Sequence, residues 1–593
     1  MSANGLDFSI AIGGAAGQGI ATPGNILARM FSRRGLHLYA YNAYQSIIRG
    51  GHILLTIRIR DREVLTHGDG IDLLLCLNQD TMDRHLRILG PGSRALYNSD
   101  KIQPGEAPDG VILCPMPIAE LAGDSKNKLI QNTISLGVMM SLIGLDFSVL
   151  EEALEQAFKR KGDAVVEENV TMAQAGYDHA TTHFESVPEP LPEGKKPLAM
   201  WTGNSALAMG GAAAGVKFYA AYPMSPATGV LHWMANHAHE LGIMVRQVED
   251  EIGVANMVIG AAHAGCRAMC ATSGGGFALM TEAIGAASMM EIPAVFINVM
   301  RAGPSTGVPT KTEQGDLWQV LGASQGDFER FIVAPKDALD AYNTVPELFN
   351  LVDRAQCPGI LISDLLISEG TFNVDPDLID LQPEIDRGDL LVDPSPNGNY
   401  LRYADTESGI SPRVTPGHEG FVHVVTTDEH DEDGVIISDE FTHPHKRRRS
   451  VEKRARKFLG VAADVSPPTL EGPQDAEVTL VGWGSTYGVI REAIEMLSEQ
   501  GVVANQLTIK WIVPFHSEVV DEILSSAKRV LIVENSHSGQ FARYLRSETG
   551  FSAHGHIRKY DGEPFMPHHV VEGVIELLES QAAIHIPYQE IIV

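Results

Sequence analysis

Cysteine is scarce in this chain of 593 residues. The five cysteines are dispersed and form no CxxC pair: Cys76, Cys114, Cys266, Cys270 and Cys357. This spacing excludes the disulfide framework of a small secreted protein. It also excludes an iron–sulfur cluster held by this chain alone, because such a cluster needs four suitably spaced thiolates.

Long apolar runs and basic charge are also lacking. No uncharged apolar run reaches the roughly 20 residues that span a bilayer. The apolar segment from Phe8 follows Asp7 rather than a basic stretch and breaks at Gly13, unlike a secretory signal. We therefore expect a cytoplasmic protein without a membrane anchor. The net charge of −30 opposes non-specific attraction to nucleic acid, so we expect no nucleic-acid partner.

The length predicts several domains, because a single hydrophobic core stops growing well before this size. We expect domains at 1–184, 198–390 and 476–593, joined by a linker at 185–197 and an extended connection at 391–475. The linker contains four prolines and no apolar period, which predicts an exposed tether. The connection is rich in proline, glycine, aspartate and histidine, and its histidines lack regular metal-ligand spacing. Its basic run at 446–449 is interpreted as a solvated helix face, with docking to an acidic partner as the alternative.

The first domain begins with a strand, a glycine turn and a helix. The glycines after the strand at 8–14 do not match the dinucleotide fingerprint, so a tight structural turn is favoured over a nucleotide site, which stays open. Apolar runs predict further strands, and a longer stretch predicts a helical region. These segments are 52–59, 71–78 and 110–116 for the strands and 127–154 for the helical region.

The central domain holds a series of glycine, proline and hydroxyl turns that alternate with apolar runs. Four such turns lie within 222–228, 247–253, 271–280 and 300–310. They are typical of loops at the carboxyl ends of parallel strands, where open α/β sheets bind their ligands. The chemistry of the protein is therefore expected here.

Two charged residues in these turns need a partner. Glu251 is followed at helical spacing by Ala255 and Ile259, which predicts that it faces the core while Asp250 faces water. A buried carboxylate needs a hydrogen-bonding partner. Arg301 ends an apolar strand and precedes a loop with two prolines, and its planar guanidinium suits a carboxylate.

These motifs together resemble the 2-oxoacid:ferredoxin oxidoreductases. YPMSP at 222–226 resembles the tyrosine-proline-isoleucine-threonine-proline turn of their pyrimidine-binding half, while GGAAGQGI and IRGGH resemble their gamma subunit. GWGST and ENSHSGQ resemble their transketolase-like carboxyl-terminal domain. The resemblance implies an alpha subunit fused to a gamma domain, with an α/β fold of three domains. These are a Rossmann-like gamma domain, a thiamine pyrimidine-binding domain with a parallel sheet, and a transketolase C-terminal-like domain.

The resemblance also implies which residues bind the coenzyme thiamine diphosphate. Tyr222, Pro223 and Ser225 belong to the turn that meets the pyrimidine ring. Glu251 is the catalytic glutamate, whose hydrogen bond to the ring nitrogen favours the imino tautomer. Arg301 is the second catalytic residue.

For the substrate, the resemblance places Arg301 at the 1-carboxylate and Thr310 at the keto group. Ser225 stands where threonine is more usual, which leaves side-chain specificity open. Arg49 and His52 are two further candidates, for an anionic substrate or the coenzyme A arm. The alternative is that they fix a loop or an interface.

The implied reaction is oxidative decarboxylation of a 2-oxoacid, with coenzyme A taking the acyl group and ferredoxin taking the electrons. Magnesium, the diphosphate and a 4Fe–4S cluster are expected in a separate beta subunit, within a dimer of alpha–beta heterodimers. GDG at 68–70 superficially resembles the thiamine metal motif, but it precedes a strand and lacks paired asparagines, so we interpret it as a turn. No metal is therefore expected in this chain.

The fused arrangement and the GHEG tail favour 2-oxoglutarate, giving succinyl-CoA and CO2, with reversal toward CO2 fixation left open. Pyruvate or a branched-chain 2-oxoacid is the alternative substrate. A non-redox thiamine enzyme and a scaffold with a degenerate site are the alternatives in kind.

Overall fold

In the computed structural model the chain forms two compact units. The structure describes residues 5–45, 50–123, 125, 129–187, 191–392, 400–437 and 443–588. The first unit comprises the described residues of Met1–Trp201, Gly370–Ile379 and Tyr588–Val593, and the second those of Thr202–Glu369 and Asp380–Pro587.

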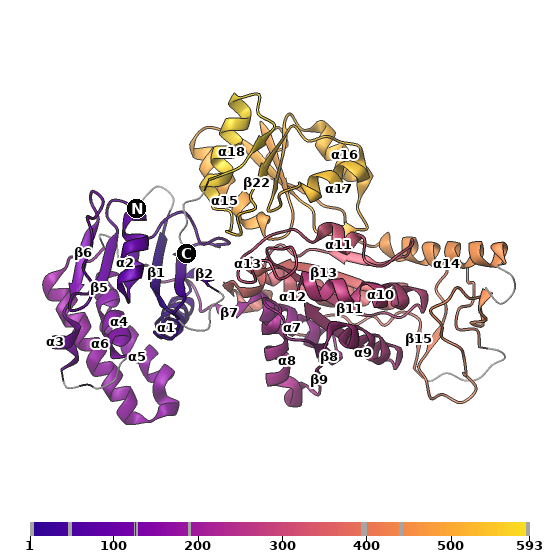
Figure 1. Cartoon of the computed structure of the whole chain (residues 1–593), viewed down its shortest axis with the longest axis horizontal. Helices are drawn as coiled ribbons and strands as arrows, with labels where there is room; N and C mark the ends of the chain where they lie inside the picture. Colours follow the sequence, from indigo (N-terminus) through magenta and orange to yellow (C-terminus); the bar gives the residue numbers. More distant parts are fainter. Residues whose placement is uncertain are drawn as a thin grey trace. The chain divides into compact units, whose positions relative to one another are not determined.

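An eight-stranded sheet forms the centre of the first unit (Figure 1). β1, β4, β5 and β6 run parallel, and β3 pairs antiparallel with both β1 and β2. The strand order is β6 (Ile112–Met116), β5 (Arg94–Asn98), β4 (Leu73–Cys76), β1 (Asp7–Ala15), β3 (His52–Arg60), β2 (His37–Tyr44), β14 (Thr371–Val374) and β7 (Ala199–Thr202). The four apolar runs of this region that predicted strands are therefore confirmed, whereas β2, β5, β7 and β14 were not predicted.

The helices of the first unit pack closely where glycine allows it. They are α1 (Ala21–Arg33), α2 (Gln79–His85), α3 (Ile118–Ala122), α4 (Ile130–Leu142), α5 (Phe147–Phe158) and α6 (Asp163–His183). A Cβ on Gly137 of α4 would lie 1.8 Å from the carbonyl oxygen of Ala173 in α6. The helical region expected at 127–154 is broken between α4 and α5, where Gly144 has a φ of +72° and Asp146 caps α5 by accepting from the Ser148 N–H.

The side chain of Gln18 fills the glycine turn after β1. Gln18 Oε1 accepts hydrogen bonds from the Ala15 N–H at 2.6 Å and from Asn78 Nδ2 at 3.0 Å. A Cβ on Gly14 would lie 2.9 Å from the same oxygen. These contacts support the structural turn over the nucleotide site.

The linker is packed against the first unit. The Val187 N–H donates to the carbonyl of Leu142, and the Gly194 N–H to that of Arg34, both at 2.7 Å. The Leu191 side chain is buried. The prediction of an exposed tether is therefore wrong for Leu191, whereas Glu193, Gly194 and Lys195 are exposed as predicted.

The second unit contains a seven-stranded sheet that is parallel apart from one edge strand. Its order is β20 (Trp511–Val513), β12 (Phe331–Val333), β13 (Gly359–Asp364), β11 (Val295–Met300), β10 (Arg267–Thr272), β8 (Val216–Ala221) and β9 (Met244–Gln247), with β20 antiparallel to β12. One hydrophobic core contains α9 (Glu251–His263) and α10 (Gly274–Met289). A second contains α7 (Gly203–Ala213), α8 (Thr228–Leu241) and α12 (Ala338–Ala355). Helices thus cover both faces, as expected for an open α/β sheet.

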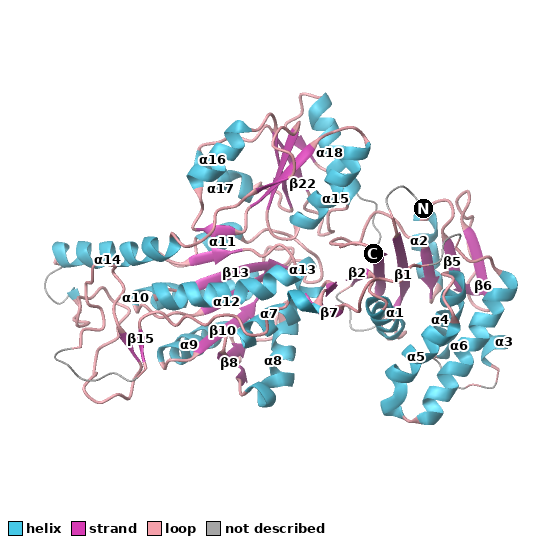
Figure 2. Cartoon of the chain, turned by 180° about the vertical axis from the view of Figure 1, so that it is seen from behind, coloured by secondary structure: helices cyan, strands magenta, loops and turns pink. Residues whose placement is uncertain are grey.

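A six-stranded sheet follows in the carboxyl-terminal part of this unit (Figure 2). Its order is β17 (Leu470–Glu471), β19 (Ala504–Thr508), β18 (Val478–Gly482), β21 (Val530–Glu534), β22 (Gly555–Arg558) and β23 (Ile584–His585). The helices of this part are α15 (Thr486–Glu499), α16 (Ser517–Ser526), α17 (Gln540–Thr549) and α18 (Pro567–Glu579). Trp483 and Phe541 share the core of α9 and α10, so the two sheets of this unit are joined by packing.

The connection after the central sheet is ordered where it is described. Two short helices, α11 (Leu317–Leu321) and α13 (Leu365–Glu369), precede the connection. The short strands β15 (Leu390–Leu391) and β16 (Arg413–Val414) and the long helix α14 (Pro444–Ala462) follow them. Arg447 and Arg454 of α14 both pair with Glu429, and Lys446 pairs with Asp431. The basic run is therefore satisfied within the chain, which favours the helix face over docking to an acidic partner.

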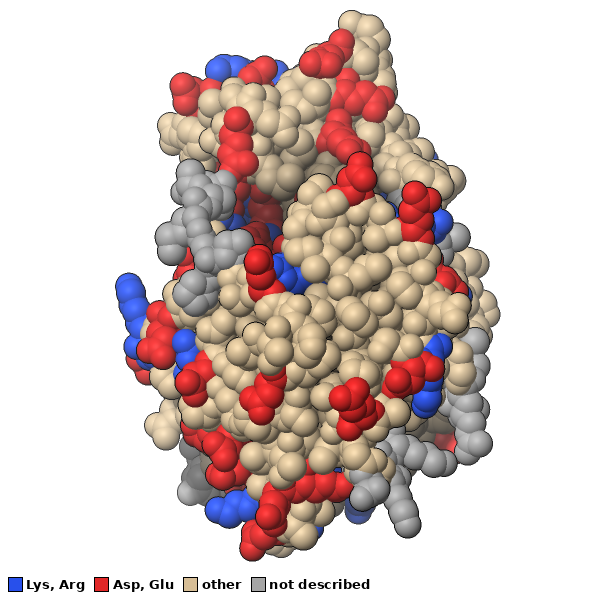
Figure 3. Space-filling view, turned by 90° about the vertical axis from the view of Figure 1, so that its left-hand side faces the viewer, with Lys and Arg blue, Asp and Glu red and all other residues tan. Residues whose placement is uncertain are grey.

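The surface carries mainly acidic charge. Figure 3 shows acidic side chains spread over the face in view with few basic ones among them, in keeping with the net charge of −30. Among the helices of the described residues, none combines the length and the apolar composition needed to cross a membrane.

Candidate functional site

Four turns meet at the carboxyl edge of the seven-stranded sheet, as the sequence predicted. They follow β8, β9, β10 and β11, which are mutually parallel neighbours. Parallel strands direct their carboxyl ends to one edge. The site is therefore assembled by strand direction rather than by nearness in the sequence.

Glu251 occupies the first position of α9 and is buried. Asp250 is exposed and caps the helix, with its Oδ1 accepting from the Gly253 N–H at 2.7 Å. Glu251 is 3% exposed, and its Oε1 has no hydrogen-bond partner among the described residues. The opposite orientations predicted for these neighbouring carboxylates are confirmed.

The unpartnered oxygen of Glu251 lies against the first turn of α10. A Cβ on Gly276 would lie 2.5 Å from Glu251 Oε1 and 2.1 Å from Thr272 Oγ1. Glycine at 276 thus makes room for the carboxylate. Leaving a buried carboxylate oxygen unpaired costs about 1–3 kcal/mol or more, so this geometry calls for a donor from outside the chain. The protonated ring nitrogen of an aminopyrimidine fits that requirement.

The turn after β8 is held by Arg301. Arg301 follows β11, and its Nη1 donates to the carbonyl oxygen of Ser225 at 2.8 Å. Pro223 and Ser225 are exposed, and Tyr222 packs partly buried against the core. Burial lowers the pKa of Arg301, and the nearby Asp316 opposes this change. Arg301 retains further N–H groups for another acceptor.

The loop after Arg301 folds back on itself. Val308 N–H donates to the carbonyl of Ala302 at 2.9 Å, and Ala302 N–H to that of Lys311 at 3.0 Å. Lys311 forms an ion pair with Glu563. Thr310, between these contacts, is buried. Its expected role at the keto group stays a prediction.

A pocket of about 580 Å³ opens beside Arg301. Its lining includes Gly274, Gly275, Glu313 and Asp316, and it also includes residues 536–538 and Gln540, which follow β21. Burial raises the pKa of both Glu313 and Asp316, although Asn298 donates to Asp316 Oδ2 at 3.0 Å and opposes the change there. Burial therefore favours the neutral form of both acids.

Residues 536–540 and Asp316 were not predicted to line this site. The sequence related ENSHSGQ only to the transketolase-like carboxyl-terminal domain, and nothing in the local pattern shows that this turn meets the loop after β11. A cluster of polar residues between a strand and a glycine was the available signal.

The candidates of the first domain lie in the other unit. His52 is 3% exposed, with its Nε2 2.8 Å from Nε2 of His85 and its Nδ1 3.3 Å from a carboxylate oxygen of Asp80. Burial lowers the pKa of both histidines, that of His85 to about 3. Their rings are therefore neutral at pH 7. Arg49 lies outside the described residues, and the coenzyme A role of both residues stays a prediction.

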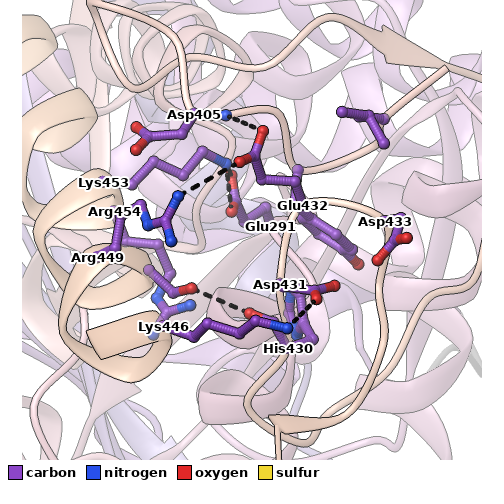
Figure 4. A pocket seen from close by; sticks show the side chains of 13 residues that line it. Glu291, Asp405, His430, Asp431, Glu432, Asp433, Lys446, Arg449, Lys453 and Arg454 are labelled. Atoms are coloured by element: carbon purple, nitrogen blue, oxygen red, sulfur yellow. Dashed lines mark hydrogen bonds and ion pairs between the residues drawn. The ribbon is translucent and has the colours of Figure 1, made fainter. Parts of the chain in front are cut away.

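A second pocket, of about 270 Å³, lies between α14 and the segment at 401–433 (Figure 4). The carboxylate of Glu291 accepts hydrogen bonds from Lys453 Nζ at 2.8 Å and from Lys457 Nζ at 2.7 Å. Arg454 donates two hydrogen bonds to the carboxylate of Glu429. Because these charges neutralise one another, we interpret this pocket as structural. Nowhere in the described residues do three or more His, Cys, Asp or Glu side chains form a group suited to a metal ion.

Three family models match successive parts of the chain. The model described as "Pyruvate ferredoxin/flavodoxin oxidoreductase" matches residues 9–179. "Pyruvate flavodoxin/ferredoxin oxidoreductase, thiamine diP-bdg" matches 209–449, and "Pyruvate:ferredoxin oxidoreductase core domain II" matches 476–570.

Relatives and a solved structure extend this likeness over almost the full length. The 2-oxoacid:ferredoxin oxidoreductase 2 alpha subunit of Aeropyrum pernix is 30% identical over 97% of this chain and 98% of its own. The 2-oxoglutarate synthase subunit KorA of Methanothermobacter thermautotrophicus is 30% identical over 63% of this chain and 97% of its own. The structure of 2-oxoglutarate:ferredoxin oxidoreductase from Magnetococcus marinus, with 2-oxoglutarate, coenzyme A and succinyl-CoA bound, aligns with a TM-score of 0.90 at 30% identity, covering 96% of this chain and 99% of that one. The chain belongs to the alpha subunits of the 2-oxoacid:ferredoxin oxidoreductases.

Proposed function

We propose that this chain, together with a beta subunit, converts 2-oxoglutarate and coenzyme A to succinyl-CoA and CO2 while two electrons pass to ferredoxin. The observation that carries the proposal is the buried, unpartnered oxygen of Glu251 beside Gly276. The names of the Methanothermobacter and Magnetococcus proteins support 2-oxoglutarate as the substrate. In this proposal the enzyme is cytoplasmic and works in either direction.

Glu251 would hold the aminopyrimidine of thiamine diphosphate. Its free oxygen would share a proton with the ring nitrogen, and the apolar core around α9 would exclude water from that hydrogen bond. Tyr222 and Pro223 would border the same ring. When bound, thiamine diphosphate supplies the carbon nucleophile for the 2-keto carbon. Its diphosphate, Mg²⁺ and the 4Fe–4S cluster are assigned to the beta subunit.

Arg301 would orient the substrate. Its bond to the Ser225 carbonyl fixes the guanidinium, and the remaining N–H groups face the 1-carboxylate of the 2-oxoacid. Ser225 and Thr310 would contact the keto end. Fixing the arginine in advance lowers the entropic cost of orienting the substrate.

The test is reconstitution of the chain with a beta subunit, thiamine diphosphate, Mg²⁺ and coenzyme A. Ferredoxin reduction is followed with 2-oxoglutarate, pyruvate and a branched-chain 2-oxoacid. Activity that depends on ferredoxin and is highest with 2-oxoglutarate is expected. Release of CO2 without ferredoxin reduction would instead identify a non-redox thiamine enzyme, and no reaction with any 2-oxoacid would identify a scaffold.

A further inference from the structure

One wall of the pocket beside Arg301 comes from the carboxyl-terminal part of the chain. Ser536, His537, Ser538 and Gln540 line it. Among the described residues that line this pocket, Arg301 and His537 are the basic ones. His537 is exposed, so its ring is accessible to a molecule that enters.

The turn that carries His537 is tied at both ends to the loop after β11. Gln314 and Asn535 exchange two hydrogen bonds, Gln314 N–H to the Asn535 carbonyl at 2.6 Å and Asn535 N–H to Gln314 Oε1 at 3.0 Å. Gln540 donates to the carbonyl of Gly315 at 2.7 Å and accepts from the Trp318 N–H at 3.0 Å. These four bonds flank Asp316, so the two walls of the pocket keep a fixed separation.

The ring of His537 contacts an aromatic neighbour. It lies edge-on to Tyr560, with the ring centroids 4.8 Å apart at 88°. Gly539 has a φ of +69°, and a Cβ there would lie 2.4 Å from the guanidinium of Arg558. Glycine is therefore required for the turn to close against Arg558. A binding group positioned in this way loses little conformational entropy when it takes a ligand.

The helix α10 adds donors to the same pocket. Ser273 at its amino-terminal end makes no side-chain cap, and the structure describes no acceptor for the N–H groups of Gly274 and Gly275. The Ser538 side chain also lines the pocket. Near His537 an anion would thus meet several hydrogen-bond donors.

We propose that His537 binds the second carboxylate of a dicarboxylic 2-oxoacid and so sets the preference for such substrates over monocarboxylic ones. The inference rests on the proposed function, in which Arg301 binds the 1-carboxylate. A monocarboxylic 2-oxoacid satisfies Arg301 alone, whereas the far carboxylate of 2-oxoglutarate needs a cation of its own once it leaves water. His537 is the basic group that the lining provides for it.

The experiment compares 2-oxoglutarate with pyruvate in the reconstituted alpha–beta complex. The variants are His537→Gln, which removes the imidazole ring, and His537→Lys, which places an ammonium group at the same position. His239→Gln on α8, an exposed histidine outside the pocket lining, is the control. In His537→Gln the ratio of kcat/KM for 2-oxoglutarate to that for pyruvate should fall about ten- to hundredfold, the usual effect of losing a hydrogen bond to a charged group.

The expected origin of that fall is a higher KM for 2-oxoglutarate, with His537→Lys recovering most of the ratio and His239→Gln leaving it unchanged. An equal effect of His537→Gln on both substrates would overturn the inference, and so would an unchanged ratio. If the wild-type complex fails to reduce ferredoxin with every 2-oxoacid tested, the proposed function itself is wrong.

Discussion

At the scale of single residues, the site depends on a carboxylate whose neighbours in sequence point elsewhere. Glu251 is buried, while Glu249 and Asp250 are exposed. Asp250 caps the helix, whereas Oε1 of Glu251 has no hydrogen-bond partner among the described residues. A polar group buried without a partner is unusual in native proteins and points to a ligand.

Replacing Glu251 by Gln should lower the turnover of the reconstituted complex by about 10²–10⁴-fold, the usual effect of losing an acid–base group. The amide keeps the size of the carboxyl but cannot share a proton with the pyrimidine in the same way. Ferredoxin reduction at saturating 2-oxoglutarate measures the loss.

The matched control is Glu249→Gln, which alters an exposed carboxylate two residues earlier. It should retain wild-type turnover. A Glu251→Gln complex as active as this control would remove Glu251 from the catalytic machinery.

The sequence identified the residues whose environment is set locally. The burial of Glu251 follows from the helical spacing of Ala255 and Ile259, and Arg301 follows an apolar strand. His537 was missed because its place depends on Gln314, more than two hundred residues earlier, and no local pattern records such a contact. The burial of Thr310 also depends on tertiary folding rather than on its own loop.

At the scale of elements, α10 is adapted to the carboxylate beside it. Its first turn consists of Gly274, Gly275 and Gly276, which is costly for a helix because glycine is flexible in the unfolded chain. Of these glycines, Gly276 lies against both Thr272 and Glu251. Close packing rather than helix propensity therefore explains its presence.

Gly276→Ala should destabilise the protein by about 1–3 kcal/mol, because the added methyl has no space. Gly275→Ala is the control, since a Cβ there would meet only the Ser305 carbonyl oxygen, at 4.0 Å. Thermal unfolding of the two variants should show a lower Tm for Gly276→Ala alone. Equal Tm values would contradict the packing argument.

A second element, α14, is fixed through buried charge. Burial raises the pKa of Glu291, but the positive charges of Lys457, Lys453 and Arg402 lower it by more than burial raises it. The pKa of Glu291 therefore lies below its ordinary value. The ionised carboxylate stabilises the fold above the ordinary glutamate pKa. That contribution is lost as the pH falls below about 4 toward the lowered pKa.

Glu291→Gln should therefore cost about 3–5 kcal/mol at pH 7, because two buried lysines lose their partner. The difference from wild type should shrink in acid. Urea unfolding at pH 7 and at pH 3.5 measures both effects. Glu452→Gln, which breaks the exposed pair with Arg448, should change stability by less than about 0.5 kcal/mol at either pH.

The elements recovered from sequence were those with long apolar runs or strong end signals. β14 was missed because it is four residues long and gains its place through Asn373, which bonds to Leu38, 335 residues earlier in the chain. The break between α4 and α5 was missed although Gly144 and Asp146 supplied a stop and a cap. In that case the signal was present and the continuous apolar pattern overrode it.

At the scale of the whole molecule, apolar side chains are exposed near the candidate site. Ile252, Met257 and Leu279 on α9 and α10 are exposed large apolar residues close in sequence to Glu251 and the glycine turn. In the proposed function the beta subunit holds the diphosphate of the same coenzyme. It must therefore reach the surface around Glu251, and we expect it to cover these side chains.

Ile252→Arg should weaken binding of the beta subunit at least tenfold, because a charge would enter an apolar interface. Titration of the labelled chain with beta subunit measures the dissociation constant. Val503→Arg provides the comparison, since Val503 is 50% exposed and Ile252 is 52% exposed. Equal affinities of the two variants would place the beta subunit elsewhere.

The chain returns to its first sheet at β14, and this affects how the protein could be divided into two polypeptides. The first unit recruits β14, which pairs with β2 although it lies far beyond the linker. Separating the protein into two polypeptides at the linker would leave the amino-terminal fragment without β14 and β7, the last two strands at that end of its sheet, which its companion would still carry. The two fragments are therefore expected to reassemble by strand complementation, in which one fragment inserts β14 beside β2 of the other.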